Sequence, residues 1–132
     1  MMKKLKSFRD LVVWKLASEF SKVIASLIKK FPDRERYALS DDLLRAARSI
    51  PANIAEGWGR WNVKEKIQFY NIANASAEEC ANHLIEAVNN KYLDEEKSLI
   101  FQKKIHVIAV KLTNLMNVTR KRIRSSGSKQ RP

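Results

Sequence analysis

"RAARSIPANIAEGWGRW", residues 45–61, sets a proline inside a helical pattern and then adds two glycines and two tryptophans. Pro51 lacks a backbone N–H donor and crowds the carbonyl one turn earlier, near Ala47, so a helix that continues through it should kink. The apolar residues around the proline are small, which lets a neighbouring helix approach closely: Ala46, Ala47, Ala52 and Ala55. We therefore interpret the stretch as a kinked packing segment of a helix.

Two polar residues of this stretch, Asn53 and Glu56, lie three positions apart and so share one helix face. We expect a buried Asn53 amide to satisfy a carbonyl freed by the proline, and Glu56 to pair with Arg45, Arg48 or Arg60. A catalytic role would need a paired base, a nucleophile or a metal cluster, which the neighbouring sequence does not supply. A dinucleotide-binding fingerprint also fails, because Asn62 stands where GxGxxG requires its third glycine.

The aromatic end of the stretch has two interpretations. Trp58, Arg60 and Trp61 form the mixture of aromatic and basic side chains that stacks on unpaired nucleic-acid bases. Tryptophans at such a position also close the end of a helical bundle, and the sequence favours this second interpretation.

The rest of the chain follows the spacing of amphipathic helices, with apolar residues recurring every three or four positions. Two capping boxes, Ser7 with Asp10 and Asn62 with Glu65, mark helix starts. The pattern predicts four helices, over residues 7–30, from 34 or 40 to 56, over 63–91, and from 94 into the basic tail. Short connections make an all-α, antiparallel, up-and-down four-helix bundle the expected fold. We expect residues 1–124 to form the bundle domain and residues 125–132 a flexible basic tail.

The last helix carries more apolar residues than one buried face requires. Ile100, Val107 and Val110 lie away from its main stripe, and a bundle helix needs only one apolar face. The surplus predicts contact with another subunit. The alternative is that neighbouring helices of the same chain bury these three residues.

The net charge of +12 is concentrated at the chain ends. The first nine residues hold four basic groups and no acid, and residues 120–132 hold six basic groups and no acid, which leaves 16 Lys and Arg against 14 Asp and Glu between them. Such clusters neutralise phosphates and bind nucleic acid, RNA being the expected target, or they simply complement the helix dipole and aid solubility. The candidate nucleic-acid-binding residues are Lys3, Lys4, Lys6, Arg120, Lys121, Arg122 and Arg124.

Several function classes lack support in the sequence. The single cysteine, Cys80, rules out an internal disulfide and fits a reducing compartment, and neither a signal peptide nor a membrane span is present, so we expect a cytoplasmic protein without a membrane partner. The cluster of Glu79, Cys80, His83 and Glu86 lacks the repeated Glu-x-x-His motif of di-iron bundles and enough ligands for zinc. We expect no metal, no cofactor and no enzymatic activity.

"LLRAARSIPANIAEGWGR", residues 43–60, resembles the signature of the four-helix bundle proteins, also called 23S ribosomal RNA intervening-sequence proteins. The resemblance extends over roughly residues 8–118, through "FRDLVVW", "FPDRERYAL" and "ASAEE". The matching signature residues are Arg45, Ser49, Pro51, Asn53, Glu56 and Gly57. The chain departs from the usual pattern at Asp42, where Gln is common, and in "NASAEEC", residues 74–80.

The resemblance implies a small antiparallel bundle that assembles as a ring-shaped homopentamer, in a family whose members are often encoded within large-subunit ribosomal RNA genes. It also implies kinship with the accessory variability determinant of diversity-generating retroelements, a basic pentamer that binds nucleic acid and a reverse transcriptase. Two functions follow as expectations. The first is a non-enzymatic oligomer that binds RNA or DNA through its basic ends, and the second is a scaffold that docks a partner enzyme such as a reverse transcriptase.

Overall fold

The structure is a computed structural model that describes residues 5–122 in full and the backbone of residues 123–130. Its four α-helices are α1 (Val12–Leu27), α2 (Leu39–Trp58), α3 (Val63–Asn89) and α4 (Glu95–Gln130). Three short 3₁₀ turns accompany them, η1 (Phe8–Asp10), η2 (Ile28–Lys30) and η3 (Asp33–Glu35), and the described residues form no strand. The predicted all-α fold with four helices is confirmed.

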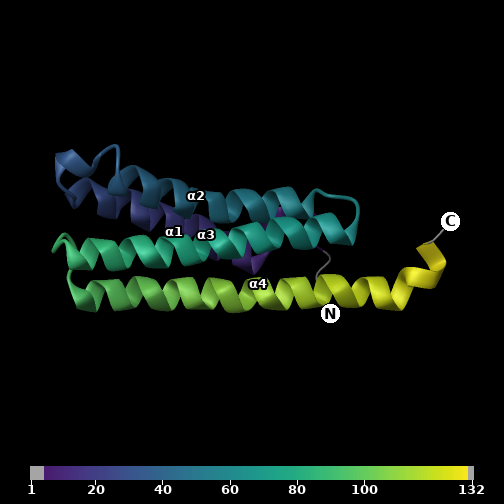
Figure 1. The fold of residues 1–132 in the computed structure, drawn as a ribbon. Helices are drawn as coiled ribbons and strands as arrows, with labels where there is room; N and C mark the ends of the chain where they lie inside the picture. Colours follow the sequence, from purple (N-terminus) through teal and green to yellow (C-terminus); the bar gives the residue numbers. More distant parts are fainter. Residues whose placement is uncertain (1–4, 131–132) are drawn as a thin grey trace.

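The helices run up and down beside one another (Figure 1). A short turn joins α2 to α3 at one end of the bundle, and another joins α3 to α4 at the opposite end. Helix α1 packs against α2 and α4, and α3 packs between α2 and α4. Helix α4 continues past the α2–α3 turn, so its C-terminal part projects beyond the rest of the bundle (Figure 1).

The predicted helix starts hold locally, with one change in where the first helix begins. The Ser7 and Asp10 capping box is present, but it caps the 3₁₀ turn η1, and Leu11 adopts an extended conformation before α1 begins. At α3 the Asn62 side chain accepts a hydrogen bond from the backbone N–H of Glu65 at 2.8 Å. At α4 the Asp94 carboxylate accepts one from the N–H of Lys97, also at 2.8 Å.

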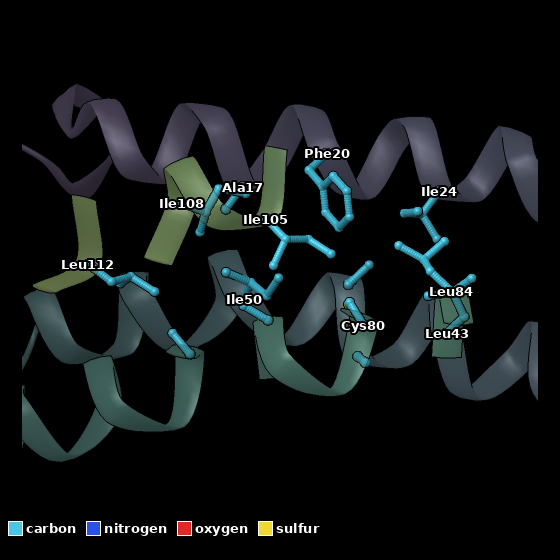
Figure 2. Packing of buried hydrophobic residues seen from close by; sticks show 14 of the residues in the cluster. Ala17, Phe20, Ile24, Leu43, Ile50, Cys80, Leu84, Ile105, Ile108 and Leu112 are labelled. Atoms are coloured by element: carbon cyan, nitrogen blue, oxygen red, sulfur yellow. The ribbon is translucent and has the colours of Figure 1, made fainter. Parts of the chain in front are cut away.

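All four helices contribute to one apolar core (Figure 2). Its most deeply buried large side chains are Tyr70, Ile24, Leu43, Ile50, Ile54, Leu84, Ile108 and Leu112. Each such aliphatic side chain contributes about 1.5–3 kcal/mol when it leaves water. This core fixes the relative positions of the helix ends, where the charged residues lie.

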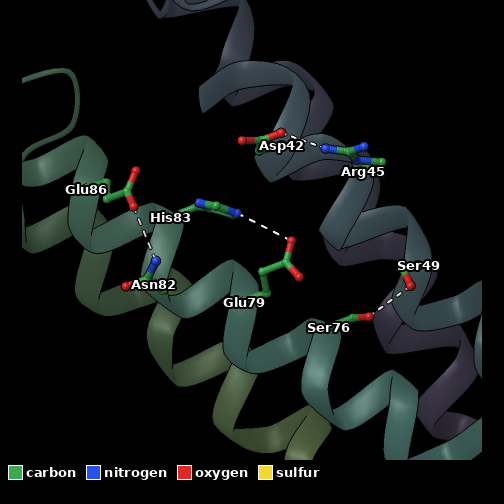
Figure 3. A network of polar contacts seen from close by, with 8 residues as sticks. All are labelled: Asp42, Arg45, Ser49, Ser76, Glu79, Asn82, His83 and Glu86. Carbon is green, nitrogen blue, oxygen red and sulfur yellow. Dashed lines mark hydrogen bonds and ion pairs between the residues drawn. The ribbon is translucent and has the colours of Figure 1, made fainter. Parts of the chain in front are cut away.

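Pro51 lies inside α2, and the helix continues through it to Trp58, two residues past the predicted end at Glu56. The expectation for Asn53 was wrong. Its amide donates to the carbonyl of Ser49 at 2.8 Å and to the Ser49 hydroxyl at 2.9 Å, because a helical side chain reaches the carbonyl four residues back, not the one near Ala47. The Ser49 hydroxyl then meets that of Ser76 on α3 at 2.8 Å (Figure 3).

Helix α4 continues to Gln130, so the backbone of residues 125–130 is helical where the sequence predicts a flexible tail. Residues 131–132 lie outside the described residues, and the division of the chain into bundle and tail stays a prediction. None of the helices in the described part of the chain is long and apolar enough to span a bilayer.

The surplus apolar residues of α4 are not covered by their own chain. Ile100, Val107 and Val110 are 56%, 44% and 45% exposed, which excludes the alternative that neighbouring helices bury them. Leu16 on α1 and Val107 on α4 line one groove of about 280 Å³ between these helices. Contact with a second subunit stays a prediction that these exposed side chains favour.

Candidate nucleic-acid interface

The N-terminal segment that leads into α1 and the C-terminal part of α4 lie at the same end of the bundle, near the α2–α3 turn (Figure 1). A pocket of about 410 Å³ shows how closely they meet. Leu5 from the N-terminal segment, Lys66 from the start of α3 and Arg122 from α4 all line it. Residues that are far apart in the sequence thus form one surface, which we call the basic end.

The basic end gathers positive charge. Lys6 is exposed on the N-terminal segment, and Arg120, Lys121 and Arg122 are exposed on α4. Lys66 is part-buried between them, and its pKa is lowered from the ordinary value by burial and by the nearby charge of Arg122. No acid lines the pocket among the described residues, so an anionic group that enters it would meet no carboxylate in its walls.

The structure describes the side chains of only some of the predicted binding residues. Arg122 lines the pocket of the basic end, and Lys6, Arg120 and Lys121 lie next in the chain to the lining residues Leu5, Thr119 and Arg122. Lys3 and Lys4 lie outside the described residues. Arg124 is on the helical backbone of α4, and its side chain lies outside the described part.

Lys66 is a member of this surface that the sequence analysis missed. Its Nζ donates to the carbonyl of Trp58 at 2.7 Å and to that of Gly57 at 3.4 Å, so it satisfies the C-terminal end of α2. A cation in the first turn of a helix is disfavoured by that helix's own dipole. A lysine in this unfavourable position, one turn after the Asn62 cap, indicates that its charge is stabilised by a partner outside its own helix.

The two tryptophans of the signature stretch have different environments. Trp58 packs against the core and lies beneath Lys66, whose Nζ is 5.7 Å from the ring centroid. Trp61 is 98% exposed in the α2–α3 turn. Arg60 is held by Glu56 at 2.7 Å and by the ring of Phe69 at 4.6 Å. Trp58 thus closes the end of the bundle, and Trp61 is free to stack on a base.

The remaining signature residues make contacts within α2 and with α3. Arg45 pairs with Asp42 at 2.6 Å, and Glu56 pairs with Arg60, one of its three predicted partners. Gly57 is buried against α3, where an added Cβ would come within 2.6 Å of the Tyr70 ring. These residues stabilise the helix pair, as predicted for a structural segment.

The Glu79, Cys80, His83 and Glu86 cluster does not converge on one point. The His83 Nε2 lies 3.4 Å from Glu79, whereas Glu86 accepts from Asn82 at 3.3 Å (Figure 3). Cys80 points into the core, where burial and, to a lesser extent, the charge of Glu79 raise the pKa of its thiol to about 12. Among the described residues, no three His, Cys, Asp or Glu side chains are placed to share a metal ion.

Residues 9–114 match the profile of the 23S rRNA-intervening sequence proteins. A similar solved structure is a protein of unknown function from the S23 ribosomal protein family of Bacteroides thetaiotaomicron VPI-5482, with 25% sequence identity and a TM-score of 0.74. The match covers 80% of this chain and 98% of that one. No curated protein matches the sequence. The chain belongs to the 23S rRNA-intervening sequence protein family.

Proposed function

We propose that the protein is a non-enzymatic, self-associating four-helix bundle that binds RNA through its basic end. The observation that carries the proposal is the convergence of the N-terminal segment around Lys6 with the exposed cations of α4, Arg120, Lys121 and Arg122, at the end of the bundle whose turn exposes Trp61. The family is named for intervening sequences of 23S rRNA, which favours RNA over DNA as the ligand.

The chemistry of this end suits an unpaired or structured RNA. Exposed Lys and Arg side chains bind phosphates with affinity that falls steeply as salt rises and that depends little on base sequence. An exposed aromatic ring adds stacking on a splayed base, which every base can accept. Trp61 and the α4 cations supply both kinds of contact on one surface.

Self-association would multiply the binding surface. The exposed Ile100, Val107 and Val110 favour contact between copies, and a ring of five, as the family resemblance implies, would place five basic ends near one another. Each copy then contributes its own phosphate contacts to one bound RNA, which raises the overall affinity without new chemistry.

A second candidate function is a scaffold that docks a partner enzyme such as a reverse transcriptase. The same exposed apolar residues on α4 favour it, because a large exposed apolar patch marks a protein contact. It becomes the better account if the purified protein binds no RNA.

The test compares two triple variants by fluorescence anisotropy with a labelled structured RNA. One replaces Arg120, Lys121 and Arg122 by alanine at the basic end. The matched control replaces three exposed cations at the other end of the bundle, Lys29, Lys30 and Arg36. We expect the first variant to lose at least tenfold in affinity and the control to lose less than threefold. Equal losses would show that net charge, and not the basic end, drives binding.

A further inference from the structure

The outer faces of α3 and α4 carry opposite charge. From Ile67 to Asn90 the chain contains three acids, Glu78, Glu79 and Glu86, and no Lys or Arg. After Glu96 the chain contains no acid at all, and α4 exposes Lys103 and Lys104 near the middle of the bundle, where Glu19 of α1 lines the same groove. One face of the molecule is therefore acidic and the neighbouring one basic.

Each of these two helices also exposes apolar side chains. Ile72 and Ile85 are exposed on α3, and Ile100, Val107 and Val110 on α4. A face that combines apolar residues with charges of one sign fits a partner with apolar residues and the opposite sign. The protein has both faces, so a second copy of the chain supplies the complement.

Like faces cannot serve this purpose. A contact between two α4 faces would bring the Lys103 and Lys104 side chains of both copies together, and a contact between two α3 faces would do the same for Glu78 and Glu79. Like charges brought together in an interface destabilise it by several kcal/mol. Charge complementarity therefore favours a contact between unlike faces, α4 of one copy with α3 of the next.

The heights of the residues along the bundle agree with this pairing. Gln102 Nε2 on α4 donates to the carbonyl of Ala81 on α3 at 3.0 Å, so these two residues lie at about the same height along the bundle. Because α3 and α4 are antiparallel, any two of their residues whose numbers sum to about 183 also lie at the same height. Lys104 is then level with Glu79, and Lys103 lies beside that level. By the same relation Ile85 is level with Ser98, next to the exposed Leu99, and Ile72 is level with Lys111, next to the exposed Val110.

We infer that copies assemble head to tail, with α4 of one chain against α3 of the next and Lys103 and Lys104 facing Glu78 and Glu79. The inference rests on the self-association in the proposed function and names its interface. If a rotation about an axis parallel to the helices relates one copy to the next, each residue keeps its height along the bundle. The lysines of α4 then lie at the height of the glutamates of α3 in the next copy, and the exposed apolar residues of the two helices also lie at similar heights. Unlike-face contacts related by such a pure rotation close into a ring when the rotation angle divides a full turn. Every basic end then lies on the same rim of the ring.

The experiment is a charge exchange in the full chain, with the assembled mass measured by sedimentation velocity in the absence of nucleic acid. One variant carries Lys103→Glu and Lys104→Glu, a second carries Glu78→Lys and Glu79→Lys, and a third carries all four changes. The control, Lys29→Glu with Lys30→Glu, makes the same charge change on another exposed pair. Circular dichroism verifies that each variant is folded.

We expect the wild type and the control to assemble, each pair variant to associate at least tenfold more weakly, and the fourfold variant to recover assembly. A monomeric wild type, a pair variant that assembles normally, or a folded fourfold variant that stays monomeric would overturn the inference. Because the measurement contains no RNA, a protein that assembles but does not bind RNA contradicts the proposed binding function alone.

Discussion

Gly57 shows why a single residue of the signature stretch tolerates so little change. It lies inside α2, where glycine is a poor helix former, yet it faces Tyr70 and Phe69 of α3 so closely that a Cβ would lie 2.6 Å and 3.1 Å from their atoms. Its role is to let the two helices approach. Gly59 closes the same helix, and its added Cβ would meet nothing nearer than 3.7 Å.

The two glycines therefore predict opposite outcomes for the same substitution. Gly57→Ala should lower the free energy of unfolding by about 1–3 kcal/mol, because the Tyr70 ring must move. Gly59→Ala should leave it unchanged or raise it slightly, since the backbone there has ordinary helical angles. Urea unfolding followed by circular dichroism measures both, and equal losses would contradict the packing role of Gly57.

Cys80 and Tyr70 predict how stability depends on pH. Burial raises the pKa of both side chains to about 12, from ordinary values of 9.0 and 10.0. Between pH 9 and 12 the unfolded chain releases protons that the folded chain retains, so stability falls as pH rises. We expect a loss on the order of 2–4 kcal/mol by pH 11, measured by urea unfolding, and a shallower decline in Cys80→Ala. A decline of the same steepness in that variant would contradict the assignment to the buried thiol.

Residue-level features could be predicted where they depend on nearby sequence. The caps at Ser7 and Asn62 follow from a side chain and a backbone N–H two or three positions away, and the structure contains both. The partners of Asn53 and Lys66 could not be predicted in the same way. Ser76 and the carbonyl of Trp58 come into reach only once α2 and α3 have packed.

At the scale of elements, the four helices follow from apolar spacing, and the differences lie at their ends. The first helix starts at Val12 and not at Ser7, because Leu11 is extended between the cap and the helix. The second continues two residues past the predicted end, to Trp58, where Lys66 donates to the carbonyls of Gly57 and Trp58 at the helix end. Tertiary contacts with α3 thus set a boundary that local signals placed earlier.

The α2–α3 turn predicts a specific aromatic contribution to RNA binding. Trp61→Ala should weaken binding of single-stranded RNA at least fivefold, because stacking on one base contributes about 1–3 kcal/mol. Tyr37→Ala is the matched control, since Tyr37 is 85% exposed just before α2 begins, at the end of that helix opposite the α2–α3 turn. Fluorescence anisotropy measures both affinities. An unchanged affinity for Trp61→Ala would assign that ring no role in binding.

At the scale of the whole molecule, the sequence shows that charge lies at the chain ends but not that those ends meet. The up-and-down topology brings the start of α1 and the end of α4 to the end of the bundle that holds the α2–α3 turn (Figure 1). The same topology sets the acidic α3 beside the basic α4 and leaves apolar residues uncovered on both. The proposed binding and assembly surfaces are thus different, the basic end for RNA and the bundle sides for a second copy.

The measurement that tests this account most directly is the salt dependence of RNA affinity for the full chain and for the variant without the Arg120, Lys121 and Arg122 charges. We expect the wild-type affinity to fall linearly with salt on a double logarithmic plot, and the slope to decrease by about 2–3 in the variant, roughly 0.7–0.9 for each phosphate contact removed. An unchanged slope, or no binding at low salt, would contradict binding through the basic end and leave the partner-docking scaffold as the better account.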